Sequence, residues 1–237
     1  MKTLGLLGGM SWESSAQYYR LINQAMRERL GGTHSARLLM LSVDFAKIEA
    51  LQHAGRWDEL GDLLAGEARR LEGAGAEVLI LCTNTMHRLA ETIAAATTAP
   101  LLHIADPTAR AIAAAGHRRV GLLGTAFTME EAFYRERLEA QHGLEVLIPE
   151  ADDRAQVHRI IYEELVQGRV EARSRDIYRG VIARLVQRGA QAIILGCTEI
   201  MLLIGPEDSP VPVFDTTALH AQAAVEAALD GRLGKDG

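Results

Sequence analysis

Two cysteines are the residues of this 237-residue chain whose type and position best suit chemistry. Cys82 directly follows the apolar run Val78–Leu81, and Cys197 follows the apolar run Ala192–Leu195 after one glycine. Both runs have the length of buried strands, and both cysteines precede a segment expected to be helical. Ligands of open α/β sheets bind at the carboxyl ends of the strands. The free N–H groups of a helix N-terminus also lower the pKa of a thiol. The sequence therefore predicts two reactive thiols with lowered pKa values.

Two acid/base groups on opposite sides of a ligand suit one reaction in particular. One thiolate removes a proton from a carbon atom, and the opposite thiol delivers its own proton to the other face. General acids and bases work best when their pKa lies near the operating pH, which a tuned thiol can reach. Core packing as a small hydrophobic residue is one alternative, and a disulfide between Cys82 and Cys197 is another. Because both cysteines precede Thr at matching places, we favour acid/base chemistry.

Polar side chains close to the cysteines are candidates for holding a ligand. Hydroxyl and amide groups at the start of a helix bind anions or cap the helix with the same atoms, so both roles stay open. The turn Gly8–Ser11 either cradles a ligand through its backbone or places Met10 in the core. Gln52 follows the second predicted strand and either reaches the ligand or lies in a solvated loop. The candidate binding residues are Met10, Gln52, Thr83, Asn84, Thr85, Thr125, Thr198 and Glu199.

Short apolar runs alternate with helical patterns along the whole chain. Continuous apolar strands separated by helices are typical of parallel sheets covered on both faces, so the sequence predicts an α/β fold. Helices are expected over 12–30 and 56–72 and from Asn84 onward. The expected strands are Leu4–Leu7, Arg37–Val43, Val78–Leu81, Leu101–Ile104, Val120–Leu123, Glu145–Ile148, Ala192–Leu195 and Val211–Phe214.

The two halves of the chain repeat one another. Gly5–Gly9 matches Gly121–Thr125 at an offset of 116, and Leu79–Thr83 matches Ile194–Thr198 at an offset of 115. Two matches at nearly one offset indicate a duplicated domain of roughly 110 residues. The repeat predicts two pseudo-symmetric lobes with one cysteine in each, at equivalent positions.

Composition excludes several classes of protein. The net charge of −6 gives no basic surface for nucleic acid. No apolar run reaches the roughly 18 residues of a membrane span. The N-terminus shows no secretory signal, so we expect a cytoplasmic protein with reduced thiols.

Cofactor and metal sites are not expected. The eight histidines show no zinc-binding spacing; we expect His87 to pack or cap and His103 to lie in the core. Only Lys2, Lys47 and Lys235 are present, and none has the surroundings of a pyridoxal phosphate lysine. The glycines do not form a nucleotide-binding pattern. The adjacent carboxylates at 163 and 164 are expected on a solvated helix face.

Three segments, Gly8–Met10, Cys82–His87 and Gly196–Glu199, resemble the aspartate/glutamate racemase family over essentially the whole chain. Leu7–Ser14 together with Ser42–Phe45 resembles its broad-specificity amino-acid racemase branch. The resemblance implies a cofactor-independent amino-acid racemase whose two bases are the cysteines. It also implies two α/β lobes around an active-site cleft, and a homodimer. Because the C-terminal end returns to the first lobe in such folds, we expect lobe one at 1–99 plus 209–237 and lobe two at 100–208.

Departures from the family pattern bear on the substrate. Glutamate racemases place a His where this chain has Glu199. Aspartate racemases hold the substrate's side-chain carboxylate with an Arg and a Lys, which would fall near Ile48 or Glu49 and near Val166; a one-residue shift would admit Lys47. A buried carboxylate without a partner costs several kcal/mol, so neutral amino acids are the expected substrates.

Other functions remain open at this stage. They are aspartate racemase, hydantoin racemase, maleate isomerase or malonate decarboxylase chemistry, and amino-acid binding without catalysis.

Overall fold

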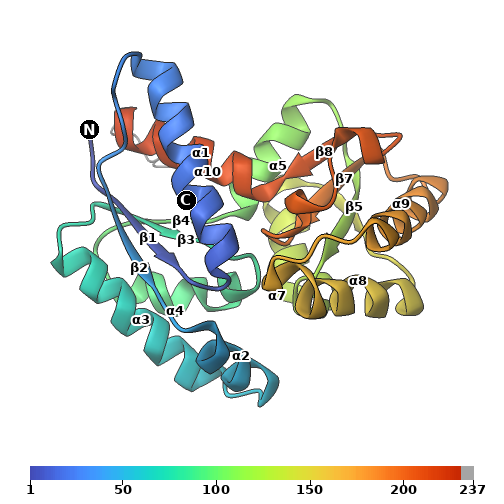
Figure 1. Cartoon of the computed structure of the whole chain (residues 1–237), viewed down its shortest axis with the longest axis horizontal. Helices are drawn as coiled ribbons and strands as arrows, with labels where there is room; N and C mark the ends of the chain where they lie inside the picture. The colour runs from blue at the N-terminus through green and yellow to red at the C-terminus, as the bar shows by residue number, and fades with distance from the viewer. Residues whose placement is uncertain (231–237) are drawn as a thin grey trace. The chain divides into compact units, whose positions relative to one another are not determined.

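The computed structural model describes residues 1–230, which form two compact units. The first unit comprises Met1–His103 and the chain from His220, and the second comprises Ile104–Leu219. Each unit contains one four-stranded sheet whose neighbouring strands are all parallel (Figure 1). The predicted α/β fold is confirmed.

The sheet of the first unit has the strand order β2-β1-β3-β4. Every residue of β1 and β3 is buried, as expected for inner strands of continuous apolar sequence. The strands are β1 (Leu4–Gly8), β2 (Leu38–Ser42), β3 (Val78–Leu81) and β4 (Leu101–Leu102). The helices of this unit are α1 (Trp12–Leu30), α2 (Phe45–His53), α3 (Trp57–Gly73), the 3₁₀ segment η1 (Thr85–Leu89), α4 (Ala90–Ala95) and most of α10 (Thr216–Asp230).

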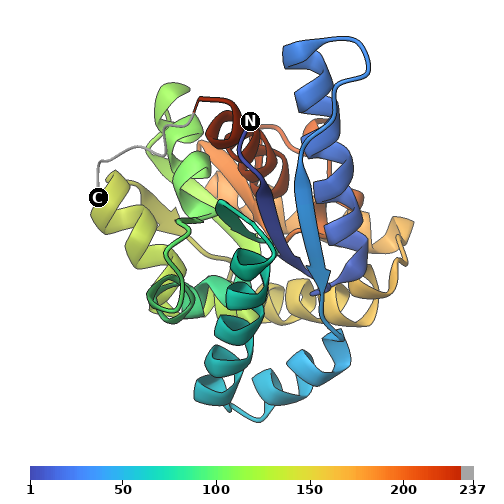
Figure 2. The same cartoon turned by 90° about the vertical axis from the view of Figure 1, so that its left-hand side faces the viewer.

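Two apolar clusters cover the faces of this sheet. Leu79 of β3 packs in a cluster with Leu64 of α3. Its neighbour Ile80 packs in a second cluster with Tyr18 of α1 and Ala224 of α10. Successive side chains of a strand point to opposite faces, so one short strand supplies both clusters. Figure 2 shows the chain passing from the end of β2 into α2 and returning along the sheet as α3.

The second unit repeats this arrangement with the strand order β6-β5-β7-β8. Its strands are β5 (Arg119–Gly124), β6 (Glu145–Leu147), β7 (Ala192–Gly196) and β8 (Val213–Asp215). Its helical segments are α5 (Ala105–Ala114), α6 (Ala126–Glu130), α7 (Ala132–Glu136), the π-helical turn η2 (Arg137–Gln141), α8 (Ala151–Glu163), α9 (Ala172–Gln187) and the 3₁₀ turns η3 (Leu165–Gln167), η4 (Ile200–Leu202) and η5 (Pro206–Asp208). The shared strand order confirms the predicted repeat.

The registers of the two sheets place the cysteines at different positions. In the first sheet Leu7 pairs with Leu81, the residue before Cys82. In the second sheet the equivalent strand position pairs with Leu195, two residues before Cys197. The second cysteine therefore lies one residue farther along the chain than the repeat predicts, and the two thiols are not equivalent.

Three local features differ from the sequence predictions. The expected loop after the second strand contains α2, so Gln52 lies on a helix. The helix expected from Asn84 begins as η1 and becomes α-helical only at Ala90. The boundaries expected at 99/100 and 208/209 fall at His103 and Leu219 in the compact units, because β8 pairs with β7 and stays with the second unit.

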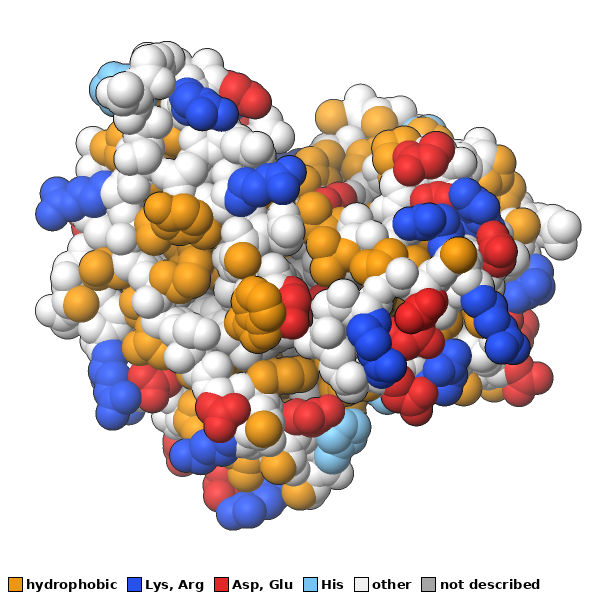
Figure 3. All heavy atoms as spheres, viewed as in Figure 1, with side chains coloured by type: hydrophobic (Ala, Val, Ile, Leu, Met, Phe, Trp, Pro, Cys, Tyr) orange, Lys and Arg blue, Asp and Glu red, His pale blue; other side chains and the backbone are white. Residues whose placement is uncertain are grey.

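Charged side chains of opposite sign alternate over α8 and α9 (Figure 3). Arg159 pairs with Glu163 at 3.0 Å, and Arg179 pairs with Asp176 at 3.2 Å. Such exposed pairs contribute at most about 1 kcal/mol each, so the apolar clusters dominate stability. Among residues 1–230, no helix is long and apolar enough to cross a membrane.

The turn after β1 depends on Gly9, which has a φ of 91°. A Cβ at Gly9 would lie 2.3 Å from the carbonyl oxygen of Val43, whereas a Cβ at Gly75, with a φ of 103°, would meet nothing within 4 Å. We expect Gly75→Ala to cost about 1–2 kcal/mol for its backbone conformation, and Gly9→Ala to cost about 1–3 kcal/mol more for the clash. Denaturant unfolding of both variants measures the difference. Equal losses would contradict the close approach at Gly9.

Candidate active site

Cys82 follows β3 and is fully buried. Its side chain belongs to the apolar cluster of Val78, Ile80 and Tyr18, and its thiol donates a weak hydrogen bond to the Ile80 carbonyl oxygen at 3.7 Å. This burial raises the pKa of the Cys82 thiol well above its usual range. The lowered pKa predicted from the sequence is wrong, because an apolar cluster surrounds the thiol and only a five-residue 3₁₀ segment follows it.

Three polar residues after Cys82 are also buried: Thr83, Asn84 and Thr85. Asn84 is the residue before η1, but its side chain makes no capping hydrogen bond to that segment. Capping therefore does not account for the burial of this amide. Polar groups are seldom buried without a structural or ligand-binding reason, so these three residues remain the candidates nearest to Cys82.

The turn between β1 and α1 adjoins Cys82. A Cβ at Gly8 would lie 3.9 Å from the Cβ of Cys82. The backbone N–H of Gly9 donates to Ser15 Oγ at 2.8 Å, and the side chain of Ser11 caps α1. The Gly9 N–H therefore has a partner within the protein. Met10 is buried in the cluster beneath α3, which is the core position that the sequence left as an alternative.

The structure bears on the alternatives that the sequence left open for Gln52 and Thr125. Gln52 is buried on α2, so the solvated-loop alternative is wrong. Thr125 caps α6, with its Oγ1 accepting from the backbone N–H of Thr128 at 3.3 Å. For Thr125 the structure supports the capping role that the sequence left open.

Cys197 lies just beyond β7 and carries its own hydrogen-bond partner. Its thiol donates to Glu199 Oε2 at 3.0 Å, and the hydroxyl of Thr198 donates to the same oxygen at 2.9 Å. All three residues are buried. Burial, followed by the negative charge of Glu199 and this hydrogen bond, raises the pKa of the Cys197 thiol well above its usual range.

The contact between Cys197 and Glu199 limits their charge states. A thiolate beside a buried carboxylate places two negative charges side by side, which an apolar environment penalises strongly. A thiolate at Cys197 is therefore costly to form, and once formed it is a strong base. The sequence selected Glu199 as a binding residue; the structure gives it a direct contact to the thiol.

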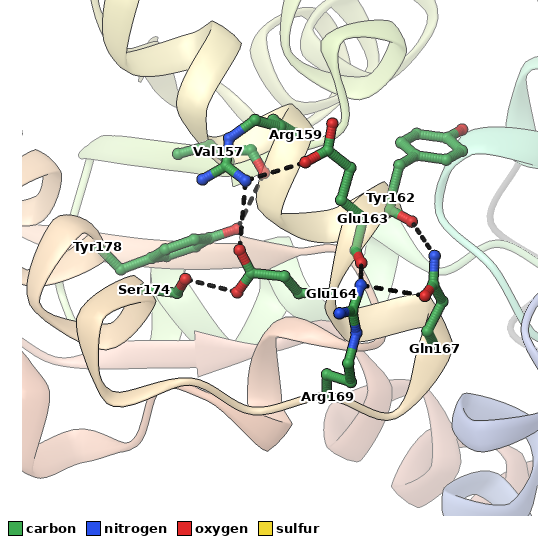
Figure 4. A network of polar contacts seen from close by, with 9 residues as sticks. All are labelled: Val157, Arg159, Tyr162, Glu163, Glu164, Gln167, Arg169, Ser174 and Tyr178. Carbon is green, nitrogen blue, oxygen red and sulfur yellow. Dashed lines mark hydrogen bonds and ion pairs between the residues drawn. The ribbon is translucent and has the colours of Figure 1, made fainter.

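Glu164 is a residue near this site that the sequence misplaced. Its side chain is only 13% exposed, compared with 62% for Glu163. The carboxylate of Glu164 accepts hydrogen bonds from Ser174 Oγ at 2.5 Å and from Arg159 Nη1 at 3.3 Å (Figure 4). The predicted solvated face is correct for Glu163 and wrong for Glu164, because the chain turns at the end of α8 and brings Ser174 of α9 against it.

Tyr178 is a buried phenol whose pKa responds both to Glu164 of this network and to Cys197. The buried Tyr178 hydroxyl donates to the Val157 carbonyl oxygen at 3.3 Å (Figure 4). Burial raises the pKa of Tyr178, and negative charge at Cys197, Glu164 and Glu199 raises it further. The phenol therefore stays protonated.

The positions considered for a substrate carboxylate hold no buried cation. Ile48 is buried in the apolar cluster beneath α3. Lys47 is exposed on α2 and lines a surface cavity of about 360 Å³ together with Ser42, Asp44 and Arg70. Within residues 1–230, the His, Cys, Asp and Glu side chains form no group of three that could hold a metal ion.

Comparison with known proteins places this geometry in a family. The family model described as Asp/Glu/hydantoin racemase matches residues 7–224. The chain belongs to this family. Racemases belong to the isomerase class of enzymes, so this protein is an isomerase.

Individual relatives agree with this membership. The broad specificity amino-acid racemase RacX of Bacillus subtilis (strain 168) is 24% identical over 231 residues, which cover 95% of this chain and 98% of the relative. The crystal structure of a putative Asp/Glu racemase from Yersinia pestis is 55% identical, with a TM-score of 0.89 and coverage of 97% and 100%. An aspartate racemase homologue from Pyrococcus horikoshii OT3 is 33% identical, with a TM-score of 0.83 and coverage of 96% and 99%.

Because Glu199 contacts Cys197, the pKa values of the two thiols should respond differently to a change at Glu199. We expect Glu199→Gln to lower the pKa of Cys197, because it removes the adjacent negative charge. Cys82 should not respond, because burial alone raises its pKa. The measurement is the pH dependence of alkylation at each cysteine, read by peptide mass spectrometry.

Glu163→Gln is the matched control, because it removes a charge from the exposed end of α8. Identical alkylation profiles for Cys197 in the two variants would show that Glu199 does not govern its pKa.

Proposed function

We propose that this protein is a cofactor-independent amino-acid racemase in which Cys82 and Cys197 are the two bases. The observation that carries the proposal is the repeated placement of one buried thiol just after an inner strand, β3 in one unit and β7 in the other. Ligand sites of parallel sheets lie at these strand ends. The similarity to a broad specificity amino-acid racemase supports the substrate class.

Two-base racemisation requires the thiols to reach one α-carbon from opposite sides. One sulfur, as thiolate, takes the α-proton and leaves the bonding electron pair on the α-carbon. The other thiol then gives its proton to the opposite face of that carbon and becomes the thiolate. The substrate is inverted, no atom is gained or lost, and the two sulfurs have exchanged protonation states for the reverse turnover.

Burial keeps both thiols protonated before substrate binds, so one thiol must release its proton to solvent water as the substrate binds, which leaves one thiolate and one thiol for the reaction. The α-ammonium group of an amino acid brings a positive charge that favours a thiolate beside it. The high pKa then becomes useful, because a thiolate of high pKa is a stronger base toward a weakly acidic α-proton. On this proposal Glu199 increases the basicity of Cys197.

The polar residues next to each thiol would hold the substrate's common groups. Thr83, Asn84 and Thr85 lie buried beside Cys82, and Thr198 lies beside Cys197. Hydroxyl and amide groups bind a carboxylate through hydrogen bonds without adding charge. We assign them the α-carboxylate and α-amine, which all amino acids share.

The side-chain preference follows from the charges nearby. Ile48 is buried among apolar residues, and the carboxylates of Glu164 and Glu199 both act on Tyr178. A substrate with a second carboxylate would lose hydration there, and Arg159, the cation that contacts Glu164, is already paired with that carboxylate. We therefore propose neutral amino acids as the preferred substrates, and we also propose a cytoplasmic homodimer.

Each cysteine should be essential for inversion. We expect Cys82→Ser and Cys197→Ser each to lower racemisation by about 10²–10⁴-fold, the usual contribution of a general acid or base. Each variant should still exchange the α-proton of one enantiomer with deuterium from D₂O, and the two variants should retain opposite enantiomers. Chiral chromatography with mass spectrometry measures both quantities. Inversion by both single variants would rule out the two-base mechanism.

The unmodified protein should prefer neutral substrates. We expect its kcat/KM for the best neutral amino acid to exceed that for Asp or Glu by about tenfold or more, because an unpaired carboxylate is costly to bury. A panel of L- and D-amino acids, assayed in D₂O without added cofactor, measures this ratio. Equal turnover of Asp at low concentration would overturn the preference. Absence of inversion and exchange across the panel would favour related chemistry on hydantoins, maleate or malonates, or binding alone.

A further inference from the structure

Three buried histidines and a tyrosine form a cluster in the first unit. The ring of His87 lies 4.5 Å from that of His103 and 5.9 Å from that of His220, centroid to centroid. The ring of Tyr18 lies edge-on to that of His220 at 5.6 Å. These residues come from η1, from the end of β4, from α10 and from α1. All four are buried.

Hydrogen bonds fix the protons of two rings. Nε2 of His220 lies 2.9 Å from the Leu102 carbonyl oxygen, which can only accept, so Nε2 carries a proton. Nδ1 of the same ring lies 2.8 Å from the hydroxyl oxygen of Tyr18, at hydrogen-bond distance. In the same way, Nδ1 of His87 lies 2.7 Å from the Thr83 carbonyl oxygen and must carry a proton.

The carbonyl that His87 holds belongs to the residue after Cys82. The backbone N–H of Cys82 is bonded to the Leu7 carbonyl oxygen at 2.9 Å, which anchors the strand side of the turn. The bond from His87 to the Thr83 carbonyl anchors the other side. Tyr18, at the far end of the cluster, lies in the same apolar cluster as Cys82.

A cluster of this kind is costly in a core. Burying polar rings requires that their hydrogen bonds be made with good geometry, and apolar residues of similar size would fill the space without that demand. The second unit has no copy of it among the described residues. By the repeat, Tyr134 takes the place of Tyr18, and its hydroxyl makes no hydrogen bond within residues 1–230.

We propose that His87, His220 and Tyr18 are positioning residues for Cys82, holding the turn at Thr83 so that the thiol keeps its place beside the substrate. This inference rests on the proposed racemase function. It assigns the cluster to one half of the reaction, because the cluster belongs to the same unit as Cys82, whereas Cys197 belongs to the second unit and has its own partner in Glu199.

The cluster also makes the Cys82 half-reaction sensitive to acid. The titratable groups facing His87 are His103 and His220, with Tyr18 behind His220. Burial, and then the charges that His103 and His220 would carry, lower the pKa of His87 well below its usual range. The ring is therefore neutral at neutral pH. Acid that protonates these rings charges a buried cluster and should loosen the turn.

The test compares His87→Leu with His87→Asn in the full chain. Deuterium exchange at Cα in D₂O is followed for each enantiomer separately, and the Cys82→Ser variant identifies which enantiomer depends on Cys82. We expect His87→Leu to slow that exchange by about 10²-fold, the usual effect of misplacing a reacting group by about 1 Å. Exchange of the other enantiomer should change less than about twofold. His87→Asn should restore much of the loss, because its amide N–H can replace Nδ1–H.

Two further variants supply a control for the loss of a histidine and a milder change within the cluster. His34→Leu removes an exposed histidine of the same unit and should leave both exchanges unchanged. Tyr18→Phe removes only one hydroxyl, so it folds more readily than His87→Leu, and it should slow the same enantiomer selectively. For the unmodified protein, Cys82-dependent exchange should hold through pH 6.5 and fall before the other exchange only when the pH drops well below the ordinary histidine pKa of about 6.5.

The two proposals fail in different ways. Equal losses for both enantiomers in folded His87→Leu and Tyr18→Phe, or no loss in either, would overturn the positioning role alone. Absence of exchange in the unmodified protein would overturn the racemase function and this inference with it.

Discussion

The cost of placing charge in apolar surroundings governs the chemistry of both units. Cys82 lies among the side chains that bind β3 to α1 and α10, so its thiol stays protonated. His87 is held neutral by the same burial. The carboxylate of Glu199 is accommodated at the second thiol through two donated hydrogen bonds, one of them from Cys197 itself. For the proposed two-base racemase, the substrate must therefore supply the charge that favours a thiolate.

The fold creates this constraint because its sheets are parallel and covered on both faces. A strand such as β3 has no solvent-facing side, so the residue that follows it starts from a buried position. The two proposed bases thus lie at strand ends, where the chain leaves the sheet but has not yet reached the surface. Glycine at 9 and the short segment η1 allow the chain to turn tightly there.

The sequence predicts the layout well because the layout depends on apolar periodicity. All eight expected strands are present, and α1 has its predicted bounds of Trp12 and Leu30. The repeat in the glycine-rich strands β1 and β5 anticipates the shared strand order. The sequence singles out the two cysteines for the same reason, since each follows an apolar run, and their role as bases stays a prediction.

What the sequence misses depends on contacts between distant segments. Glu164, which follows α8, is shielded from solvent by its contact with Ser174 of α9. The neutral state of His87 depends first on its burial and then on His103 and His220, and His220 comes from the far end of the chain. The pKa of Cys82 was misjudged because a general effect of helix ends was applied where a 3₁₀ segment and an apolar cluster decide the outcome. Local patterns carry no information on such partners.

The one-residue shift between Cys82 and Cys197 has a consequence for the balance of the reaction. Two enantiomers have equal free energy in water, and kcat/KM measures the transition state against free enzyme and free substrate. A racemase must therefore show the same kcat/KM in both directions, however unlike its two halves are. If the two halves of the proposed site act unequally, the difference can appear only in kcat and KM taken separately, because their ratio must be the same in both directions. One enantiomer can be held more tightly and converted more slowly, and the unequal halves of a duplicated chain give this freedom a structural basis.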